Sequence, residues 1–195
     1  MKKMILTLAA LTLVAGGALA QNNEIGIYTT PDANPDNTVY NGAAGPVTAY
    51  VVLTNPWNDL TNTPIVAVGG FEFYIGIPAG VFLLSTTFPP ATVNFATSPD
   101  FLCGANVPVV ENRCTLITLS LGAFSVTPGS VYLKPVQNTP QSVPGQMAIT
   151  DYFDDFRISN AYPISGDHEA PVFGLWTSVV PTEDASWGEL KSLFR

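Results

Sequence analysis

The sequence predicts an all-β protein, a single antiparallel β-sandwich of jelly-roll or immunoglobulin-like type with about nine strands and a short C-terminal helix. The 17 prolines and 16 glycines are scattered along the chain and leave few long stretches without a helix breaker. The segments between these breakers are short and rich in β-branched and aromatic residues, which often alternate with polar ones. Charged residues form only 11% of the chain, which suits strands that bury one face and carry Ser, Thr and Asn on the other.

The first element of the chain, residues 1–20, has the pattern of a cleavable signal peptide. Lys2 and Lys3 precede an apolar run over 4–15, and Ala18-Leu19-Ala20 supplies the small residues that a signal peptidase recognises. The run is shorter than the ~20 residues that cross a bilayer, so we expect no membrane span after cleavage. The expected location is secreted, periplasmic or on the cell surface.

Residues 21–181 are expected to form the sandwich domain, because no internal repeat or long linker divides them. The clearest strand covers 70–78, where Phe71, Phe73 and Ile75 share one face. The same kind of alternation or apolar run marks the other expected strands, which are 24–28, 48–55, 81–84, 92–96, 117–121, 130–136, 147–153 and 171–176.

Residues 182–195 are expected to form a polar spacer and a short amphipathic helix. Ser186 and Glu189 have the spacing of a capping box. One face of the helix carries four apolar residues, Trp187, Leu190, Leu193 and Phe194. So short a helix is marginal alone in water, so this face docks either on its own domain or on a partner.

The two cysteines, Cys103 and Cys114, are expected to form a disulfide, because an even pair in an exported chain is typical of one. The spacing does not match a C-x-x-C motif, and no histidine lies near enough in the sequence to suggest a metal site.

A carboxylate cluster, formed by Asp151, Asp154 and Asp155, leaves two interpretations open. Calcium binds six to eight oxygens of this kind, although the spacing departs from an EF-hand loop. A solvated acidic edge that discourages sheet-to-sheet aggregation would explain the same residues. No other cofactor is expected.

Catalytic side chains are scarce, and we expect no enzyme. His168 is the only histidine and no G-x-S-x-G motif accompanies it. Glu72 could supply one carboxylate of a glycosidase, but nothing in the sequence identifies a second. The net charge of −8 argues against nucleic acid, which requires clustered Lys and Arg.

Trp57 lies in a polar loop over 55–63 that is rich in Asn, Asp and Thr. Its ring is expected either to stack on a sugar or to plug the end of the sandwich.

Two segments resemble the opening of a cohesin-like domain. Residues 47–55 form a valine-alternating strand that ends in Asn, and residues 68–75 contain Gly-Phe-Glu-Phe. The resemblance implies a jelly-roll sandwich. Cohesins usually place a Tyr-Asp pair after the second strand, whereas Gly76-Ile77-Pro78 follows here, so no partner-binding residues are carried over.

These features together favour an exported, non-catalytic binding or adhesion module that contacts a protein or a polysaccharide at the cell surface. Two alternatives remain, a structural subunit of a surface layer or filament and, third in order, a secreted hydrolase. Trp57 and the apolar face of the terminal helix are the candidate partner-binding residues.

Overall fold

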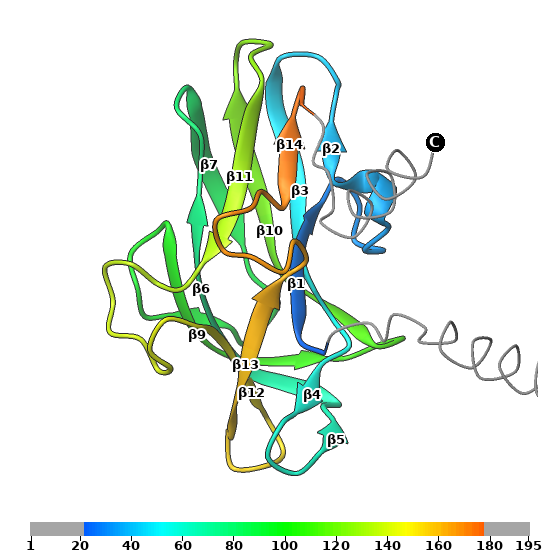
Figure 1. Cartoon of the computed structure of the whole chain (residues 1–195), viewed down its shortest axis with the longest axis vertical. Coiled ribbons are helices and arrows are strands. Elements are labelled where there is room, and N and C mark those ends of the chain that lie inside the picture. Colours follow the sequence, from blue (N-terminus) through cyan, green and yellow to red (C-terminus); the bar gives the residue numbers. More distant parts are fainter. Residues whose placement is uncertain (1–21, 178–195) are drawn as a thin grey trace, which may run out of the picture.

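The computed structural model describes residues 22–177 (Figure 1), and this part of the chain is all-β. Its only helix is a three-residue 3-10 turn, η1 (Pro35–Asn37). No helix within these residues is long and apolar enough to cross a membrane. The predicted signal peptide and terminal helix, with Trp187, Leu190, Leu193 and Phe194, lie outside the described residues.

Residues 22–177 contain fourteen strands, more than the number expected. They are β1 (Glu24–Tyr28), β2 (Val39–Tyr40), β3 (Gly45–Thr54), β4 (Trp57–Asn58), β5 (Thr63–Pro64), β6 (Ala67–Gly76), β7 (Val81–Thr87), β8 (Val93–Asn94), β9 (Asp100–Pro108), β10 (Arg113–Ala123), β11 (Gly129–Lys134), β12 (Met147–Asp151), β13 (Ile158–Pro163) and β14 (Phe173–Leu175). Each expected strand overlaps one of these. The two longer strands that the sequence did not predict are β9 and β13.

The sandwich has two layers that share one continuous hydrogen-bonded path. One layer runs β1–β3–β10–β7, and the other contains β14, β11, β6, β12 and β13, with β9 and β8 on the far side of β6. The path passes from one layer to the other where β1 pairs with β13. That pairing is parallel, as is β2 with β14, so the expected purely antiparallel sheet is corrected to a mixed one. A strand that returns to a sheet by a crossover can run parallel to its neighbour, and a single sequence gives no sign of it.

The core lies between the layers and confirms the predicted alternation. Phe71, Phe73 and Ile75 of β6 point inward and are almost completely buried. They face residues of the other layer such as Val51 and Leu53, which belong to the same buried cluster. Because the inward faces are filled, the hollows that could hold a ligand lie on the outer faces of the layers and among their loops.

Candidate functional site

An apolar groove of about 350 Å³ lies on the outer face of β6, β9 and β12. Gly70 and Gly104 form part of its floor, and Phe95 and Phe156 stand at its sides. The two phenylalanines are 72% and 52% exposed. A large side chain kept in water in this way is unfavourable unless something covers it.

The glycines determine the shape of this apolar groove. A Cβ added to Gly70 would lie 2.7 Å from the Cys103 carbonyl oxygen, a backbone atom, so no other residue fits without a shift of the strand. A Cβ on Gly69 would lie 2.7 Å from the ring of Phe156, which occupies the space above it. The Gly69-Gly70 pair at the start of β6 therefore gives a flat floor with an aromatic ring lying on it.

The loop between β11 and β12, residues 135–146, is held on the outer face by two buried carboxylates. The Asp100 carboxylate of β9 accepts the backbone N–H groups of Gln137 and Asn138, at 2.9 and 2.6 Å. The Glu72 carboxylate of β6 accepts the backbone N–H and the hydroxyl of Ser142. The loop thus forms a fixed rim of the apolar groove, whose lining includes Glu72 and Ser142.

The two catalytic candidates, Glu72 and His168, are not positioned to act together. Glu72 is only 2% exposed, and its side-chain hydrogen bonds come from Ser142. His168 lies in the loop after β13, where its Nδ1 is 3.4 Å from the Leu133 carbonyl oxygen. The two residues share no described interaction.

Two residues of the predicted carboxylate cluster, Asp151 and Asp154, both accept hydrogen bonds from the side-chain amide of Asn58. Asn58 Nδ2 donates to Asp151 Oδ2 at 3.2 Å and to Asp154 Oδ2 at 2.9 Å, and Arg157 pairs with Asp154. Asp155 is exposed on the adjoining turn. Within residues 22–177 no three His, Cys, Asp or Glu side chains are grouped so as to hold a metal ion. Asp151 is buried, so the cluster is also not simply a solvated edge.

The predicted disulfide is wrong, because Cys103 and Cys114 are free, buried thiols. Cys103 lies opposite Phe71 in one layer and Cys114 opposite Leu53 in the other. Val110 pairs with Arg113 at the turn between their strands. Cys103 is seven residues before Val110, about 23 Å of extended chain, whereas a disulfide needs Cα atoms within about 7 Å.

Trp57 is half-buried on β4, in the short β4–β5 ribbon beside the β12–β13 end of the molecule (Figure 1). Its backbone N–H donates to Asn23 Oδ1 at 2.6 Å and its indole N–H to Asn62 Oδ1 at 3.3 Å. The indole is thereby held by its own loop, and it lines neither the apolar groove nor the cavity described next.

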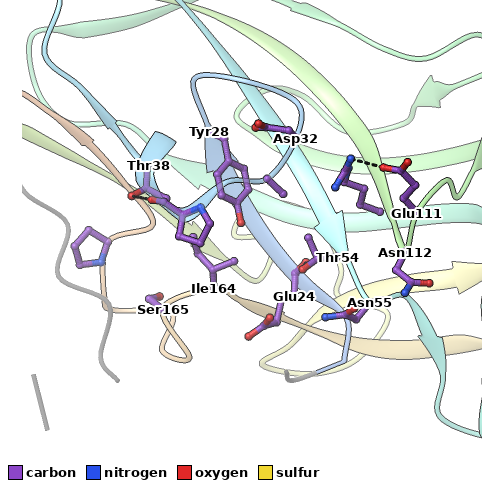
Figure 2. A pocket seen from close by; sticks show the side chains of 14 residues that line it. Glu24, Tyr28, Asp32, Thr38, Thr54, Asn55, Glu111, Asn112, Ile164 and Ser165 are labelled. Carbon is purple, nitrogen blue, oxygen red and sulfur yellow. Dashed lines mark hydrogen bonds and ion pairs between the residues drawn. The ribbon is translucent and has the colours of Figure 1, made fainter. Parts of the chain in front are cut away.

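A polar cavity of about 490 Å³ lies on the outer side of β1 and β3 (Figure 2). Glu24, Tyr28 and Thr54 project into it from the strands, and the β1–β2 loop adds Asp32. The ion pair between Glu111, in the turn before β10, and Arg113, the first residue of β10, also lines it. This cavity was not predicted from the sequence. The signal is present in the alternation of β1, whose buried Ile25 and Ile27 leave Glu24, Gly26 and Tyr28 on the outer face.

The side chain of Tyr28 lies along its own strand in the polar cavity. Its ring folds back along β1 over Gly26, where an added Cβ would lie 2.5 Å from the Tyr28 hydroxyl oxygen. This brings the hydroxyl toward Glu24, two residues further along the same face. Burial and the Glu24 carboxylate raise the pKa of Tyr28 from 10.0 to about 12, so the phenol keeps its proton at alkaline pH values where an exposed tyrosine would lose it.

No protein-family model and no curated protein matches this sequence. Among solved structures, the chain is similar to a type II cohesin domain from the cellulosome of Acetivibrio cellulolyticus, with 14% sequence identity and a TM-score of 0.44. The similarity covers 82% of this chain and 98% of that domain. That domain is of the class that residues 47–55 and 68–75 resemble in sequence.

Proposed function

We propose that this protein is an exported, non-catalytic module that binds another protein through the apolar groove on β6, β9 and β12. The observation that carries the proposal is the pair of exposed rings, Phe95 and Phe156, beside a glycine floor. Exposed apolar surface that is gathered around a concave floor is typical of protein–protein contacts.

A protein fits this groove better than a polysaccharide does. Sugar hydroxyls require several hydrogen-bonding groups, but the Glu72 carboxylate in the lining is already engaged by Ser142. One further polar atom there, Thr150 Oγ1, is buried and has no partner. An apolar side chain of a partner, lying on Gly70 and Gly104 between the two rings, matches the rest of the surface.

Export is the second part of the proposal and rests on residues 1–20. Amino-terminal sequencing of the chain recovered outside the cytoplasm should begin at Gln21. A chain that retains Met1 and stays in the cytoplasm would contradict export without affecting the groove.

The binding proposal is tested by selecting peptides from a random display library with the purified chain and by screening it against a glycan array. We expect selected peptides to carry large apolar anchors. The affinity of these peptides should fall at least tenfold in each of two variants. Phe95→Ser removes one side of the groove, and Gly104→Leu fills its floor. Phe124→Ser is the matched control, because Phe124 is 60% exposed but lies outside the groove. Peptide binding that ignores both groove variants, or glycan binding that depends on Phe95, would overturn the proposal.

A second function, subunit of a surface layer or filament, is favoured by the edge strand β7. Its only described neighbour is β10, it carries no charged residue, and Phe82 and Leu84 are exposed on it. An uncharged apolar edge can pair with a strand of another copy. Sedimentation of the purified chain over a range of concentrations distinguishes this function: assembly that Leu84→Lys abolishes supports it, and a monomer at all concentrations excludes it.

A further inference from the structure

The loop that joins β2 to β3, residues 41–44, contains the one Asn-Gly pair of the sequence, Asn41-Gly42. Both residues are exposed and neither belongs to a strand. Within residues 22–177 the side chain of Asn41 has no hydrogen-bond partner. The Gly42 N–H makes no hydrogen bond to another backbone group of the same residues. The side-chain amide and the backbone nitrogen that follows it are therefore both free to react.

A glycine after an asparagine favours one specific reaction. The asparagine amide carbon can be attacked by the backbone nitrogen of the next residue, because the attack closes a five-membered ring. A side chain on that next residue hinders the approach, and glycine has none. Other exposed asparagines of the chain precede a larger residue, and they are Asn62 before Thr63, Asn112 before Arg113 and Asn138 before Thr139.

The backbone on both sides of Asn41 is held by two aromatic residues. Trp176, which follows β14, donates its backbone N–H to the Tyr40 carbonyl oxygen and its indole N–H to the Gly42 carbonyl oxygen, both at 2.8 Å. The Tyr40 hydroxyl donates to the Ala43 carbonyl oxygen at 2.9 Å, and the Tyr40 and Trp176 rings meet edge to face. These contacts fasten the loop to the end of β14, beside which β2 lies (Figure 1).

We propose that Asn41 is a site of spontaneous modification, where the chain converts with time to aspartate and isoaspartate and the isoaspartate form releases the Trp176 indole. The Asn41-Gly42 pair does not line the apolar groove. The inference therefore does not depend on the proposed function of that groove.

The reaction needs only water. The Gly42 nitrogen bonds to Asn41 Cγ, and the side-chain nitrogen leaves as ammonia, which in net terms takes the proton of the Gly42 N–H. Water then opens the cyclic imide. Opening of the bond between Cγ and the Gly42 nitrogen gives aspartate. Opening of the bond between the main-chain carbonyl carbon of Asn41 and the same nitrogen gives isoaspartate.

The two products differ in their effect on the loop. Aspartate keeps the length of the main chain, so both hydrogen bonds of Trp176 can persist. Isoaspartate adds one carbon, about 1.5 Å, to the main chain between the Tyr40 and Gly42 carbonyl groups. Trp176 holds both of these carbonyls, so it cannot keep both bonds at the new spacing. The bond of its indole N–H to Gly42 is the one we expect to be lost, since the backbone bond to Tyr40 precedes the insertion.

The test is incubation of the purified full chain in warm neutral buffer made with heavy-oxygen water, followed by peptide mapping by mass spectrometry. We expect the peptide that contains Asn41 to give two products separable by chromatography, each with one heavy oxygen in the new carboxyl group. Peptides that contain Asn62, Asn112 or Asn138 should stay unchanged over the same time. Circular dichroism before and after incubation shows that the chain remains folded.

Variants locate the reaction. Gly42→Ala should slow it severalfold, because a Cβ then stands next to the attacking nitrogen. That Cβ also meets the Tyr40 hydroxyl oxygen at 2.5 Å, so Tyr40→Phe is the matched control. It removes the same hydroxyl, leaves Asn41-Gly42 intact and should react at least as fast as the wild type.

Hydrogen exchange at the Trp176 indole N–H, followed by NMR and assigned with Trp176→Phe, measures the structural effect. It should accelerate severalfold in the isoaspartate form. Asn41→Asp is the control for the added charge, and it should exchange as slowly as the unmodified chain.

Four results would overturn the inference. They are an Asn41 that stays intact in the folded chain while it converts in the denatured chain, equal conversion of Asn62, Asn112 and Asn138, a product without heavy oxygen, and indole exchange that isoaspartate leaves unchanged. Peptide binding at the apolar groove should be the same before and after conversion, so a failure here and a failure of the groove are distinguishable.

Discussion

Ser142 donates both its backbone N–H and its hydroxyl to the Glu72 carboxylate, with donor–acceptor distances of 3.0 and 2.5 Å, although the residues are 70 positions apart. Glu72 lies on the outer face of β6 and is nevertheless buried, because the β11–β12 loop covers it. The second buried carboxylate, Asp100, fixes the start of the same loop. A loop without regular structure thus becomes a fixed part of the outer face beside the apolar groove.

Glu72→Gln should destabilise the fold and loosen this loop. The amide keeps the shape of the side chain but loses the negative charge that two donors of Ser142 face, which costs about 1–3 kcal/mol. Denaturant unfolding gives the loss, and hydrogen exchange at the Ser142 amide should accelerate. Glu169→Gln is the control, because Glu169 is exposed and pairs only at the surface with Lys134. Equal effects in both variants would contradict the anchoring role.

Asn58→Asp should be destabilising in a way that depends on pH. Asn58 is fully buried and donates to both Asp151 and Asp154, so the substitution places a third carboxylate between two others. Like charges disfavour the ionised state of the introduced carboxyl, so the penalty is present at neutral pH and declines as the pH falls and that carboxyl takes up a proton. Melting temperatures of the wild type and the variant at pH 7 and pH 4 measure it. Asn62→Asp adds the same charge at an exposed loop position and should cost much less.

The alternation of the sequence predicts the faces of the longer strands correctly. Phe71, Phe73 and Ile75 point into the core as expected, because one buried face and one outer face require that period. The same rule fails for β9. There the inward residues Cys103 and Ala105 differ little in polarity from their outward neighbours Leu102 and Gly104, so no contrast marks the strand.

Features that depend on pairing between distant strands could not be predicted. The spacing of Cys103 and Cys114 suggested a short disulfide loop, but it contains no information on which layer each strand joins. The anchoring of residues 135–146 by Glu72 and the return of the Tyr28 ring over Gly26 are likewise three-dimensional facts. For the candidate sites, the residue types can be read from the sequence, but which of these residues lie close together depends on the fold.

The two thiols should be unreactive in the native state. Both cysteines are buried, and burial raises the pKa of each thiol to about 12, so almost no thiolate forms at neutral pH. A thiol reagent at pH 8 should modify neither residue in buffer and both in denaturant without reductant. Two thiols that remain blocked in denaturant until reduction would show that the disulfide forms after all.

The stability of the fold should decline at alkaline pH. The folded pKa values of Cys103, Cys114 and Tyr28 are all about 12, raised by burial from ordinary values of 9.0 for cysteine and 10.0 for tyrosine. Between the ordinary and the raised pKa the unfolded chain has lost a proton that the folded chain still holds. Each group therefore lowers the free energy of unfolding by up to about 1.4 kcal/mol per pH unit, from pH 9 for the cysteines and from pH 10 for the tyrosine.

Denaturant unfolding between pH 8 and 11.5 measures this slope, and variants assign it. Stability should be unaffected by these groups below pH 9, where folded and unfolded chains hold the same protons on them. Cys103→Ala with Cys114→Ala should flatten the decline that begins near pH 9, and Tyr28→Phe should flatten only the part above pH 10. Tyr132→Phe is the control for loss of a phenol, because Tyr132 is only half-buried on the outer face of β11. A decline of unchanged steepness in the cysteine variant would show that the thiols ionise without unfolding, and hence that they are open to water.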